Sequence, residues 1–294
     1  GQRTQFGRDH YFERIKNRED FTKQVPVNDY EGLRSYIEKV VEGESDVLWT
    51  GKPLYLSKTS GTTSGAKYIP LSKESLPEHI RAARNALLLY IHNSGNADFV
   101  DGKMIFLQGS PILSKKSGIL TGRLSGIVAH HVPGYLQANR KPSYEVNCIE
   151  DWEQKVDAIV KETLPEKMSL ISGIPAWVQM YFERLIEFSG KESISQIFPK
   201  FSLLVYGGVN FQPYAQRFNQ LIGKQVDTVE LFPASEGFFA YQDRQDDDGL
   251  LLNTNAGMYY EFVPMEEIGQ SHPKTLQLHE VELGVSYALV ITTN

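Results

Sequence analysis

The sequence predicts a layered α/β protein with a mostly parallel sheet, to which an antiparallel or barrel-like subregion is attached. Between residues 103 and 232, short apolar stretches alternate with longer amphipathic segments. This alternation is typical of βαβ units, whose strands are parallel. After residue 237 only short strand-like segments remain. We therefore expect an α/β part at about residues 1–237 and a β-rich part at about residues 238–294.

The expected elements follow the hydrophobic pattern along the chain. In residues 74–92, Leu76, Ile80, Ala83, Leu87 and Ile91 recur at steps of three and four, which predicts an amphipathic helix. The remaining expected elements are strand 103–107, helix 150–163, strand 169–172, helix 175–188, strand 202–206, helix 212–222 and strand 228–232, then strands 238–241, 250–253, 258–263, 276–282 and 286–292.

Composition limits the classes of function. With 294 residues, 41% hydrophobic and 22% charged, the chain is typical of a globular protein with one large or two medium domains. The net charge of -6 argues against nucleic acid or an anionic membrane as a partner, because both need a basic face. One cysteine, Cys148, cannot form an intrachain disulfide, and no signal peptide is evident. We expect a cytoplasmic protein that acts on small molecules and has no obligate protein partner.

The most informative segment runs from Thr59 to Lys67 and reads T-S-G-T-T-S-G-A-K. Its glycines let backbone N–H groups turn toward an anion, its hydroxyls are neutral donors, and its lysine supplies a positive charge. The segment lies between strand-like residues 53–56 and 68–71. It is therefore predicted to be a loop that holds the phosphates of a nucleotide.

Three other interpretations of this loop bear comparison. The Walker pattern G-x-x-x-x-G-K-[ST] does not fit, because Ala66 separates Gly65 from Lys67. Ser64 to Lys67 matches the S-x-x-K of penicillin-binding serine acylases, but Pro70 would interrupt the helix that such a serine begins. A solvated Ser/Thr/Gly linker is the third interpretation and stays open.

Two further loops follow predicted parallel strands, where open α/β sheets bind ligands. Strand 202–206 ends in Gly207-Gly208-Val209, which would let a flat heterocycle approach the backbone or would simply form a glycine turn. Strand 228–232 runs into Phe232-Pro233-Ala234-Ser235-Glu236-Gly237. This loop combines a ring for stacking, a hydroxyl for a phosphate oxygen and a carboxylate for magnesium.

In this order, T-S-G-T-T-S-G-A-K, G-G-V and F-P-A-S-E-G resemble the first three nucleotide-binding motifs of the adenylate-forming enzymes, which include acyl-CoA synthetases and luciferases. Within that superfamily the chain is most similar to the Gretchen Hagen 3 family of acyl acid amido synthetases, known from auxin conjugation. Further similarity lies in Asp20-Phe21, Val25-Pro26-Val27, Tyr30-Glu31, Gly43-Glu44, Glu280 to Gly284, and Tyr287. The resemblance implies that residues 1–294 form the large N-terminal adenylation domain. The C-terminal cap domain, with a catalytic lysine, is expected to be absent.

The resemblance also implies which residues bind ATP and Mg²⁺. Phe232 would stack on adenine, Ser235 would contact the α-phosphate, and Glu236 would bind magnesium; Lys67 and Glu236 would take part in catalysis. Phe232-Pro233 replaces the commoner Tyr-Ala or Tyr-Gly of the family. The full implied set is Ser60, Gly61, Thr62, Thr63, Ser64 and Lys67 at the phosphates, Gly207, Gly208 and Val209 beside adenine, and Phe232, Pro233, Ala234, Ser235 and Glu236.

The implied reaction has two steps. A small, possibly aromatic carboxylic acid attacks the α-phosphorus of ATP to give an acyl adenylate, and an amine or amino acid then displaces AMP to form an amide. An acyl-CoA ligase and a non-catalytic nucleotide or acyl-acid binding module are the alternatives.

The acid pocket is expected between helix 74–92 and residues 108–126, with Arg123 as the carboxylate partner or as a surface arginine. The chain alone is expected to bind Mg-ATP but to turn over poorly.

Overall fold

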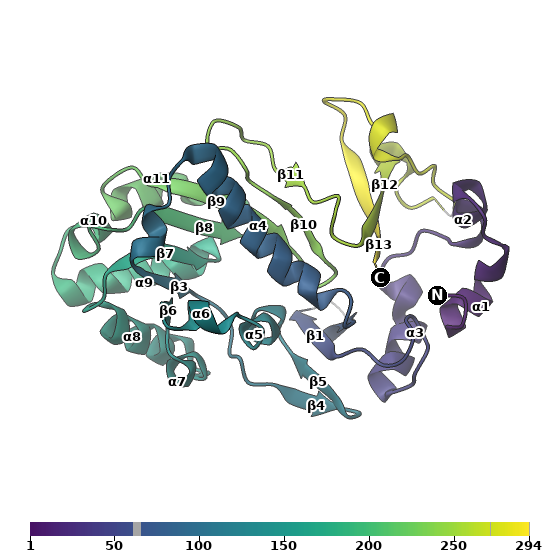
Figure 1. Ribbon diagram of the computed structural model, residues 1–294, viewed down its shortest axis with the longest axis horizontal. Helices are drawn as coiled ribbons and strands as arrows, with labels where there is room; N and C mark the ends of the chain where they lie inside the picture. Colours follow the sequence, from purple (N-terminus) through teal and green to yellow (C-terminus); the bar gives the residue numbers. More distant parts are fainter. Residues whose placement is uncertain (61–65, 271, 294) are drawn as a thin grey trace.

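A seven-stranded sheet is the centre of the computed structural model, which describes residues 1–60, 66–270 and 272–293 (Figure 1). Its strand order is β11-β10-β9-β8-β7-β3-β6. The strands from β9 to β6 in this order are parallel, whereas β10 and β11 are antiparallel. The bounds are β3 Lys103–Phe106, β6 Arg140–Lys141, β7 Met168–Gly173, β8 Leu203–Gly207, β9 Asp227–Pro233, β10 Phe238–Tyr241 and β11 Leu251–Leu252.

Helices cover both faces of this sheet. One face packs against α8 (Trp152–Thr163), α9 (Pro175–Ser189), α10 (Ile194–Ile197) and α11 (Gln212–Ile222), and the other against α4 (Leu76–Ser94) (Figure 1). Neighbouring strand residues alternate between the two cores: Ile171 faces the first and Leu170 the second. Burial on both faces explains why these strands are almost continuously apolar.

The buried face of α4 is shifted by one residue from the predicted one. Leu76 is buried as expected, but the next most buried positions are His79, Ala82, Ala86 and Tyr90. The expected apolar residues further along are only partly buried against the same core. The larger side chains therefore flank the contact, while two alanines allow the helix to lie close to the sheet.

A second, four-stranded sheet has the order β2-β1-β5-β4. Strands β1 (Tyr55–Ser60) and β2 (Ala66–Leu71) form an antiparallel hairpin, and β5 (Ile119–Gly122) pairs parallel with β1 and antiparallel with β4 (Ser114–Lys116). Helix α3 (Tyr30–Glu42) packs Ile37 and Val40 against Leu56 and Ile119. The predicted arrangement of a strand on each side of the phosphate loop is confirmed.

The C-terminal strands are divided between two sheets. Strands β10 and β11 extend the seven-stranded sheet, while β12 (Met258–Pro264) and β13 (Tyr287–Thr293) form a separate antiparallel ribbon. The predicted strand 276–282 is wrong: only Leu276 bridges to Phe262, and a 3₁₀ turn follows at Leu278–Glu280. The Glu280 carboxylate accepts from the Gln277 N–H at 2.7 Å, and this capping box stabilises a turn at the expense of extended backbone.

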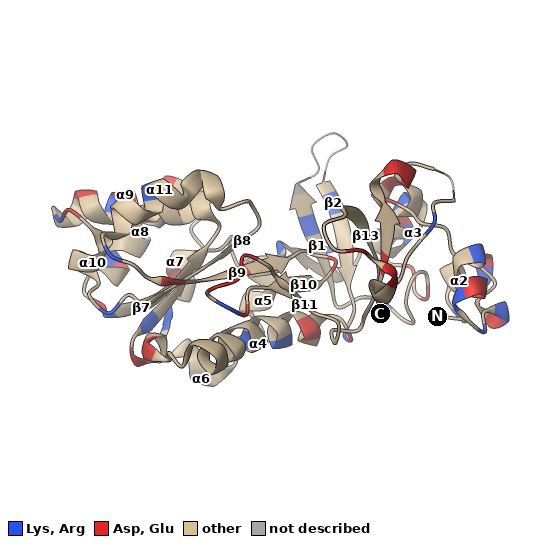
Figure 2. Ribbon diagram, turned by 90° about the horizontal axis from the view of Figure 1, so that it is seen from above, with Lys and Arg blue, Asp and Glu red and all other residues tan. Residues whose placement is uncertain are grey.

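Short elements complete the described chain: α1 Gln5–Asp9, α2 Arg18–Gln24, α5 Leu124–Ala129, α6 Gly134–Gln137, α7 Tyr144–Asn147, and 3₁₀ turns at Phe12–Arg14, Asp98–Asp101 and Met265–Glu267. Helix α2 lies beside the ribbon, where Arg18 donates to the Thr275 carbonyl and lies 3.5 Å from Glu280 (Figure 1). Acidic and basic residues are interspersed on α2 (Figure 2). In the described residues, no helix has the length and apolar character needed to cross a membrane.

Candidate active site

The loops after β8 and β9 lie side by side, because these strands are parallel neighbours whose carboxyl ends meet at one edge. Gly207 ends β8, and a Cβ there would stand only 2.2 Å from the Leu231 carbonyl oxygen of β9. Gly208 has a φ of +85°, which favours glycine. The backbone itself therefore requires both glycines, and Val209, which follows them, is exposed.

Tyr206 and Glu230 lie opposite each other just inside this edge. The Tyr206 ring stacks on Phe211 with centroids 4.1 Å apart. Burial raises the pKa of Tyr206 to about 12 and also raises the pKa of Glu230 above its ordinary value. The tyrosine is thus neutral at pH 7, one residue before Gly207.

A tight turn connects β9 to β10. The Ala234 N–H donates to the Gly237 carbonyl at 2.8 Å, and the Gly237 N–H donates back to the Ala234 carbonyl at 3.3 Å. Ser235 and Glu236 occupy the two positions between them, and Ser235 is buried whereas Glu236 is exposed. Before the turn, Pro233 ends β9, and Phe232 is 47% exposed with its ring edge-on to Phe239. A flat ligand can therefore reach one face of Phe232.

Ser235 links this turn to the other sheet. Its hydroxyl shares a hydrogen bond of 2.8 Å with the hydroxyl of Ser57, which is fully buried on β1. Strand β1 ends at Ser60, which pairs with Ala66 at the loop end of the hairpin. The hairpin that carries the predicted phosphate loop is thus joined directly to the turn that carries the predicted α-phosphate contact.

Part of the phosphate loop lies outside the described residues: Gly61, Thr62, Thr63, Ser64 and Gly65. Lys67, on β2, is described. Its Nζ lies 3.6 Å from a carboxylate oxygen of Glu31 and 4.7 Å from the centre of the Tyr30 ring, both on α3. The Lys67 side chain therefore packs against α3, and the residue lies near the loop end of the hairpin.

Glu236 lines a small hollow between α4, the β9–β10 turn and the β12–β13 ribbon. Its other walls include Glu78, His79, Met258 and Thr293. The cavity volume of about 10 Å³ is close to the minimum that holds one water molecule. His79 is 4% exposed and neither ring nitrogen has a hydrogen-bond partner among the described residues. Burial lowers the pKa of His79 to about 4, so the ring is neutral at pH 7.

Glu236 is the carboxylate that the sequence predicted as the magnesium ligand. Within residues 1–60, 66–270 and 272–293, no group of three or more His, Cys, Asp or Glu side chains could hold a metal ion. Mg²⁺ at phosphate-transfer sites is commonly bound by one or two carboxylates, with substrate phosphates and water as the other ligands. A single exposed carboxylate on a turn that contacts the β1–β2 hairpin is compatible with that mode and not with an all-protein metal cage.

Arg123 stands before α5 and is exposed, with no polar partner in the part of the chain that the structure describes. Its stem lies against the loop after β3: a Cβ at Gly109 would meet the Arg123 Cδ at 3.1 Å. The structure thus packs the stem of Arg123 against Gly109, within the predicted segment 108–126.

The fold is similar to that of a known ligase. An open conformation of 2-hydroxyisobutyryl-CoA ligase, solved with 2-HIB-AMP and CoA, superposes with a TM-score of 0.55 and 13% identity over 89% of this chain and 56% of that one. The two chains therefore share the same overall fold.

The chain belongs to the GH3 family. The family's N-terminal domain matches residues 1–141 and 121–226, and its central domain matches residues 251–294. The structure of GH3.15 acyl acid amido synthetase superposes with a TM-score of 0.76 and 18% identity over 99% of this chain and 59% of that chain. These ranges include segments 59–67, 207–209 and 280–284, from which the sequence had predicted this family, whereas segment 232–237 lies between them.

Two curated relatives give the same family assignment. Indole-3-acetic acid-amido synthetase GH3.15 of Arabidopsis thaliana is 40% identical over 82 residues, which cover 27% of this chain and 14% of that protein. Jasmonoyl-L-amino acid synthetase JAR4 of Nicotiana attenuata is 21% identical over 338 aligned positions, covering 92% of this chain and 58% of that protein. The chain thus spans little more than half the length of these longer relatives.

Two residues of this site were not predicted from the sequence. Ser57 lies two residues before the motif that begins at Thr59, and only the three-dimensional structure shows that it contacts Ser235. His79 lies one position before the predicted apolar residue Ile80 and was not singled out in the sequence. Its buried position was detectable only from the small residues Ala82 and Ala86 that continue the same face.

Proposed function

We propose that this chain is the nucleotide- and acid-binding part of an ATP-dependent acyl acid amido synthetase. The observation that carries the proposal is the buried Ser57–Ser235 hydrogen bond, which joins the β1–β2 hairpin to the β9–β10 turn. Together with family membership, this junction supports a single nucleotide site at the carboxyl edge of β8 and β9. The conjugating activities named for the relatives support amide formation as the overall reaction.

In this proposal ATP lies along that edge. The exposed face of Phe232 stacks on adenine, with Gly207, Gly208 and Val209 beside it and Pro233 and Ala234 supporting the ring. Ser235 contacts the α-phosphate. Ser60, Gly61, Thr62, Thr63, Ser64 and Lys67 contact the outer phosphates. Lys67 can reach the phosphates because its ion pair with Glu31 is partly exposed to solvent. Such an ion pair, here at 3.6 Å, contributes little free energy in water and is easily broken.

Glu236 is assigned to magnesium. When bound, Mg²⁺ neutralises charge on the phosphate oxygens and so favours attack at the α-phosphorus. The protein's own contribution is to hold the nucleotide and the acid in line and to exclude water from the adenylate. No protein nucleophile is required, since the substrate carboxylate forms the new bond to phosphorus and pyrophosphate leaves.

The second step transfers the acyl group to an amine. The nitrogen of the amine bonds to the carbonyl carbon, AMP leaves and the amine loses a proton. An acyl-CoA ligase would differ only in its acceptor, because a thiol would replace the amine. We propose an amino acid or another amine as the acceptor, because the chain belongs to this family. A small carboxylic acid is the proposed acyl donor.

Trapping of the acyl adenylate tests this proposal. The chain is incubated with Mg-ATP and a panel of aliphatic and aromatic carboxylic acids, and hydroxylamine converts any acyl adenylate to a hydroxamate. We expect hydroxamate and pyrophosphate in equal amounts, only with certain acids, at single-turnover protein concentrations. Glu236→Gln should reduce both products together.

The choice of acceptor separates the alternatives. Formation of an amide with an amino acid supports the amido synthetase, whereas a thioester formed preferentially with CoA supports a ligase of the other type. Binding of Mg-ATP without acid-dependent pyrophosphate release, even at single turnover, would contradict an adenylating role and favour a binding module.

A further inference from the structure

A second pocket lies at the edge of the seven-stranded sheet formed by β6. Its volume is about 310 Å³, and it opens where β3 and β6 end, beside Gln108 and Pro142. This volume is within the range of small-molecule sites, and the carboxyl edge of parallel strands is where such sites form. With strands about 4.8 Å apart, the pocket lies roughly 14 to 19 Å along the edge from β9. It shares no residue with the nucleotide site proposed above.

Three buried polar atoms around this pocket have no hydrogen-bond partner in the described residues: Gln108 Nε2, Arg140 Nε and Asn147 Oδ1. All three residues line the pocket, and Asn147 is only 4% exposed. Native proteins leave few buried polar groups unpaired, because each such group loses its water without replacement. Two donors and one acceptor around one cavity therefore indicate a polar ligand.

The charge of Arg140 is not balanced locally. Its Nη1 donates weakly to the Ala129 carbonyl at 3.4 Å, and its guanidinium lies 5.8 Å from the centre of the Phe106 ring. No carboxylate of the described chain forms an ion pair with it. Burial lowers the pKa of Arg140, as expected for a cation that has lost water without gaining an anion.

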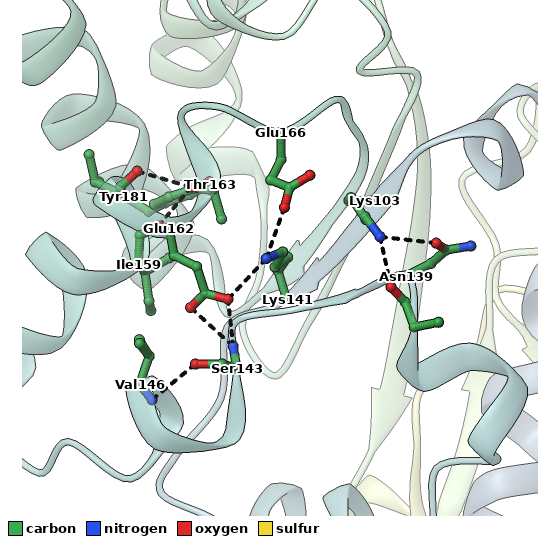
Figure 3. A network of polar contacts seen from close by, with 12 residues as sticks. Lys103, Asn139, Lys141, Ser143, Val146, Ile159, Glu162, Thr163, Glu166 and Tyr181 are labelled. Atoms are coloured by element: carbon green, nitrogen blue, oxygen red, sulfur yellow. Dashed lines mark hydrogen bonds and ion pairs between the residues drawn. The ribbon is translucent and has the colours of Figure 1, made fainter.

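Lys141, the residue after Arg140, differs from it by having carboxylate partners. Lys141 lies 3.1 Å from Glu162 and 2.9 Å from Glu166, so two carboxylates surround one ammonium group (Figure 3). Glu162 also accepts from the Ser143 backbone N–H at 2.9 Å. Glu162 and Glu166 thus both form ion pairs with Lys141. Arg140, the preceding residue, lines the pocket.

The walls of the pocket are held in place before any ligand binds. Lys155, 2% exposed on α8, donates to the backbone carbonyls of Asn147 at 2.7 Å and Gln108 at 3.1 Å. One buried ammonium group therefore fixes the two residues whose side chains present an acceptor and a donor. The Glu162–Ser143 hydrogen bond fixes the third wall. Such support is typical of a preorganised binding site.

We propose that this pocket binds a small organic acid that carries a hydroxyl or ammonium group beside its carboxylate. The carboxylate pairs with Arg140 and accepts from Gln108 Nε2, and the neighbouring O–H or N–H donates to Asn147 Oδ1. Pro111, Ala129 and Pro142 supply an apolar wall for the rest of the ligand. A 2-hydroxy acid and an α-amino acid share this chemistry, and they differ in which donor meets Asn147.

Calorimetry in the absence of nucleotide tests the proposal with four probes. Mandelate carries a carboxylate and a hydroxyl, phenylglycine a carboxylate and an ammonium, phenylacetate a carboxylate alone, and mandelamide a hydroxyl without the charge. We expect mandelate or phenylglycine to bind more tightly than phenylacetate, and mandelamide to bind least. Whichever of the first two binds more tightly identifies the donor.

Variants assign the contacts. Arg140→Met should weaken binding about ten- to a hundredfold, the loss of one hydrogen bond to a charged group. Asn147→Leu should abolish the preference for the tighter probe over phenylacetate. Arg217→Met is the control, since it removes an exposed arginine from α11 that does not line the pocket, and it should leave all four affinities unchanged.

Stability separates a ligand-binding arginine from a structural one. Because Arg140 has no counter-ion, Arg140→Met should unfold at a temperature no lower than wild type, whereas a structural arginine would destabilise the protein when removed. Should that variant fail to fold, Gln108→Leu tests the same carboxylate contact. Equal affinity in the Arg140 or Gln108 variant and wild type, loss of binding in Arg217→Met, or no binding of mandelate or phenylglycine up to about 10 mM would each overturn the proposal.

Discussion

The hydrogen bond between Ser57 and Ser235 makes a quantitative prediction about the junction of the two sheets. Both hydroxyls are buried and 2.8 Å apart. Ser57→Ala leaves the Ser235 hydroxyl without its partner in a site closed to water, which costs about 1 to 3 kcal/mol. Ser235→Ala should cost a similar amount. The double variant should lose less than the sum, by a coupling free energy of about 0.5 to 1.5 kcal/mol.

Urea denaturation of the wild type, both single variants and the double variant measures this coupling. Ser114→Ala, on an outer strand of the same four-stranded sheet, is the matched control, because its hydroxyl makes only a 3.4 Å contact with the Thr121 carbonyl. It should change the free energy of unfolding by less than about 0.5 kcal/mol. Strictly additive losses in the double variant would refute the argument that the two hydroxyls act as one contact.

The Ser57→Ala variant also tests the predicted contact between Ser235 and the α-phosphate of the nucleotide. Because ATP and AMP share the α-phosphate, Ser57→Ala should weaken the binding of both by similar factors through displacement of Ser235. Calorimetry with each nucleotide measures the two ratios. A loss confined to ATP would place Ser235 near the outer phosphates and contradict its assignment.

Three further predictions concern single residues. Lys67→Ala should weaken ATP binding about ten- to a hundredfold with little effect on AMP; equal losses would show that Lys67 only supports the loop. Glu236→Gln should weaken nucleotide binding in the presence of Mg²⁺ but not in its absence, with an unchanged circular dichroism spectrum; an equal loss without Mg²⁺ would contradict a metal ligand. The depressed pKa of His79, about 4 against an ordinary 6.5, means that the unfolded chain binds the extra proton first. Stability should therefore fall as pH drops from about 6.5 to 4, by about 3 kcal/mol from this group, and His79→Leu should remove that part of the decline; an identical pH profile in the variant would refute the assignment.

The α/β architecture followed from local patterns. Helix α11 and strand β10 begin and end at the predicted residues, and the other predicted helices and parallel strands of the sheet differ by only a few residues. These elements are buried on a periodic face, so apolar spacing determines them. Segment 276–282 failed because its alternating apolar residues coincide with a capping box, and the hydrogen bond at Gln277 favours the turn. Periodicity carries no information about such a contact.

The candidate site was predictable where residues are adjacent in sequence and not where the fold brings them together. The turn after β9 could be read directly, because Phe232, Ser235 and Glu236 occur within five positions. Ser57 could not, since its only distinguishing feature is a contact with a residue in the other sheet. Arg140 was missed for a similar reason: sequence shows that it is charged, but only the structure shows that no carboxylate faces it.

The central claim is that the carboxyl edge of β8 and β9, with the β1–β2 hairpin, forms one Mg-ATP site, and titration of the chain with ATP tests it most directly. We predict saturable binding of one ATP per chain that is tighter with Mg²⁺ than without it and is weakened in Ser235→Ala, while the circular dichroism spectrum of the variant matches wild type. Absence of binding by the folded wild-type chain, or binding that is the same with and without Mg²⁺ and unaffected by Ser235→Ala, would contradict the account.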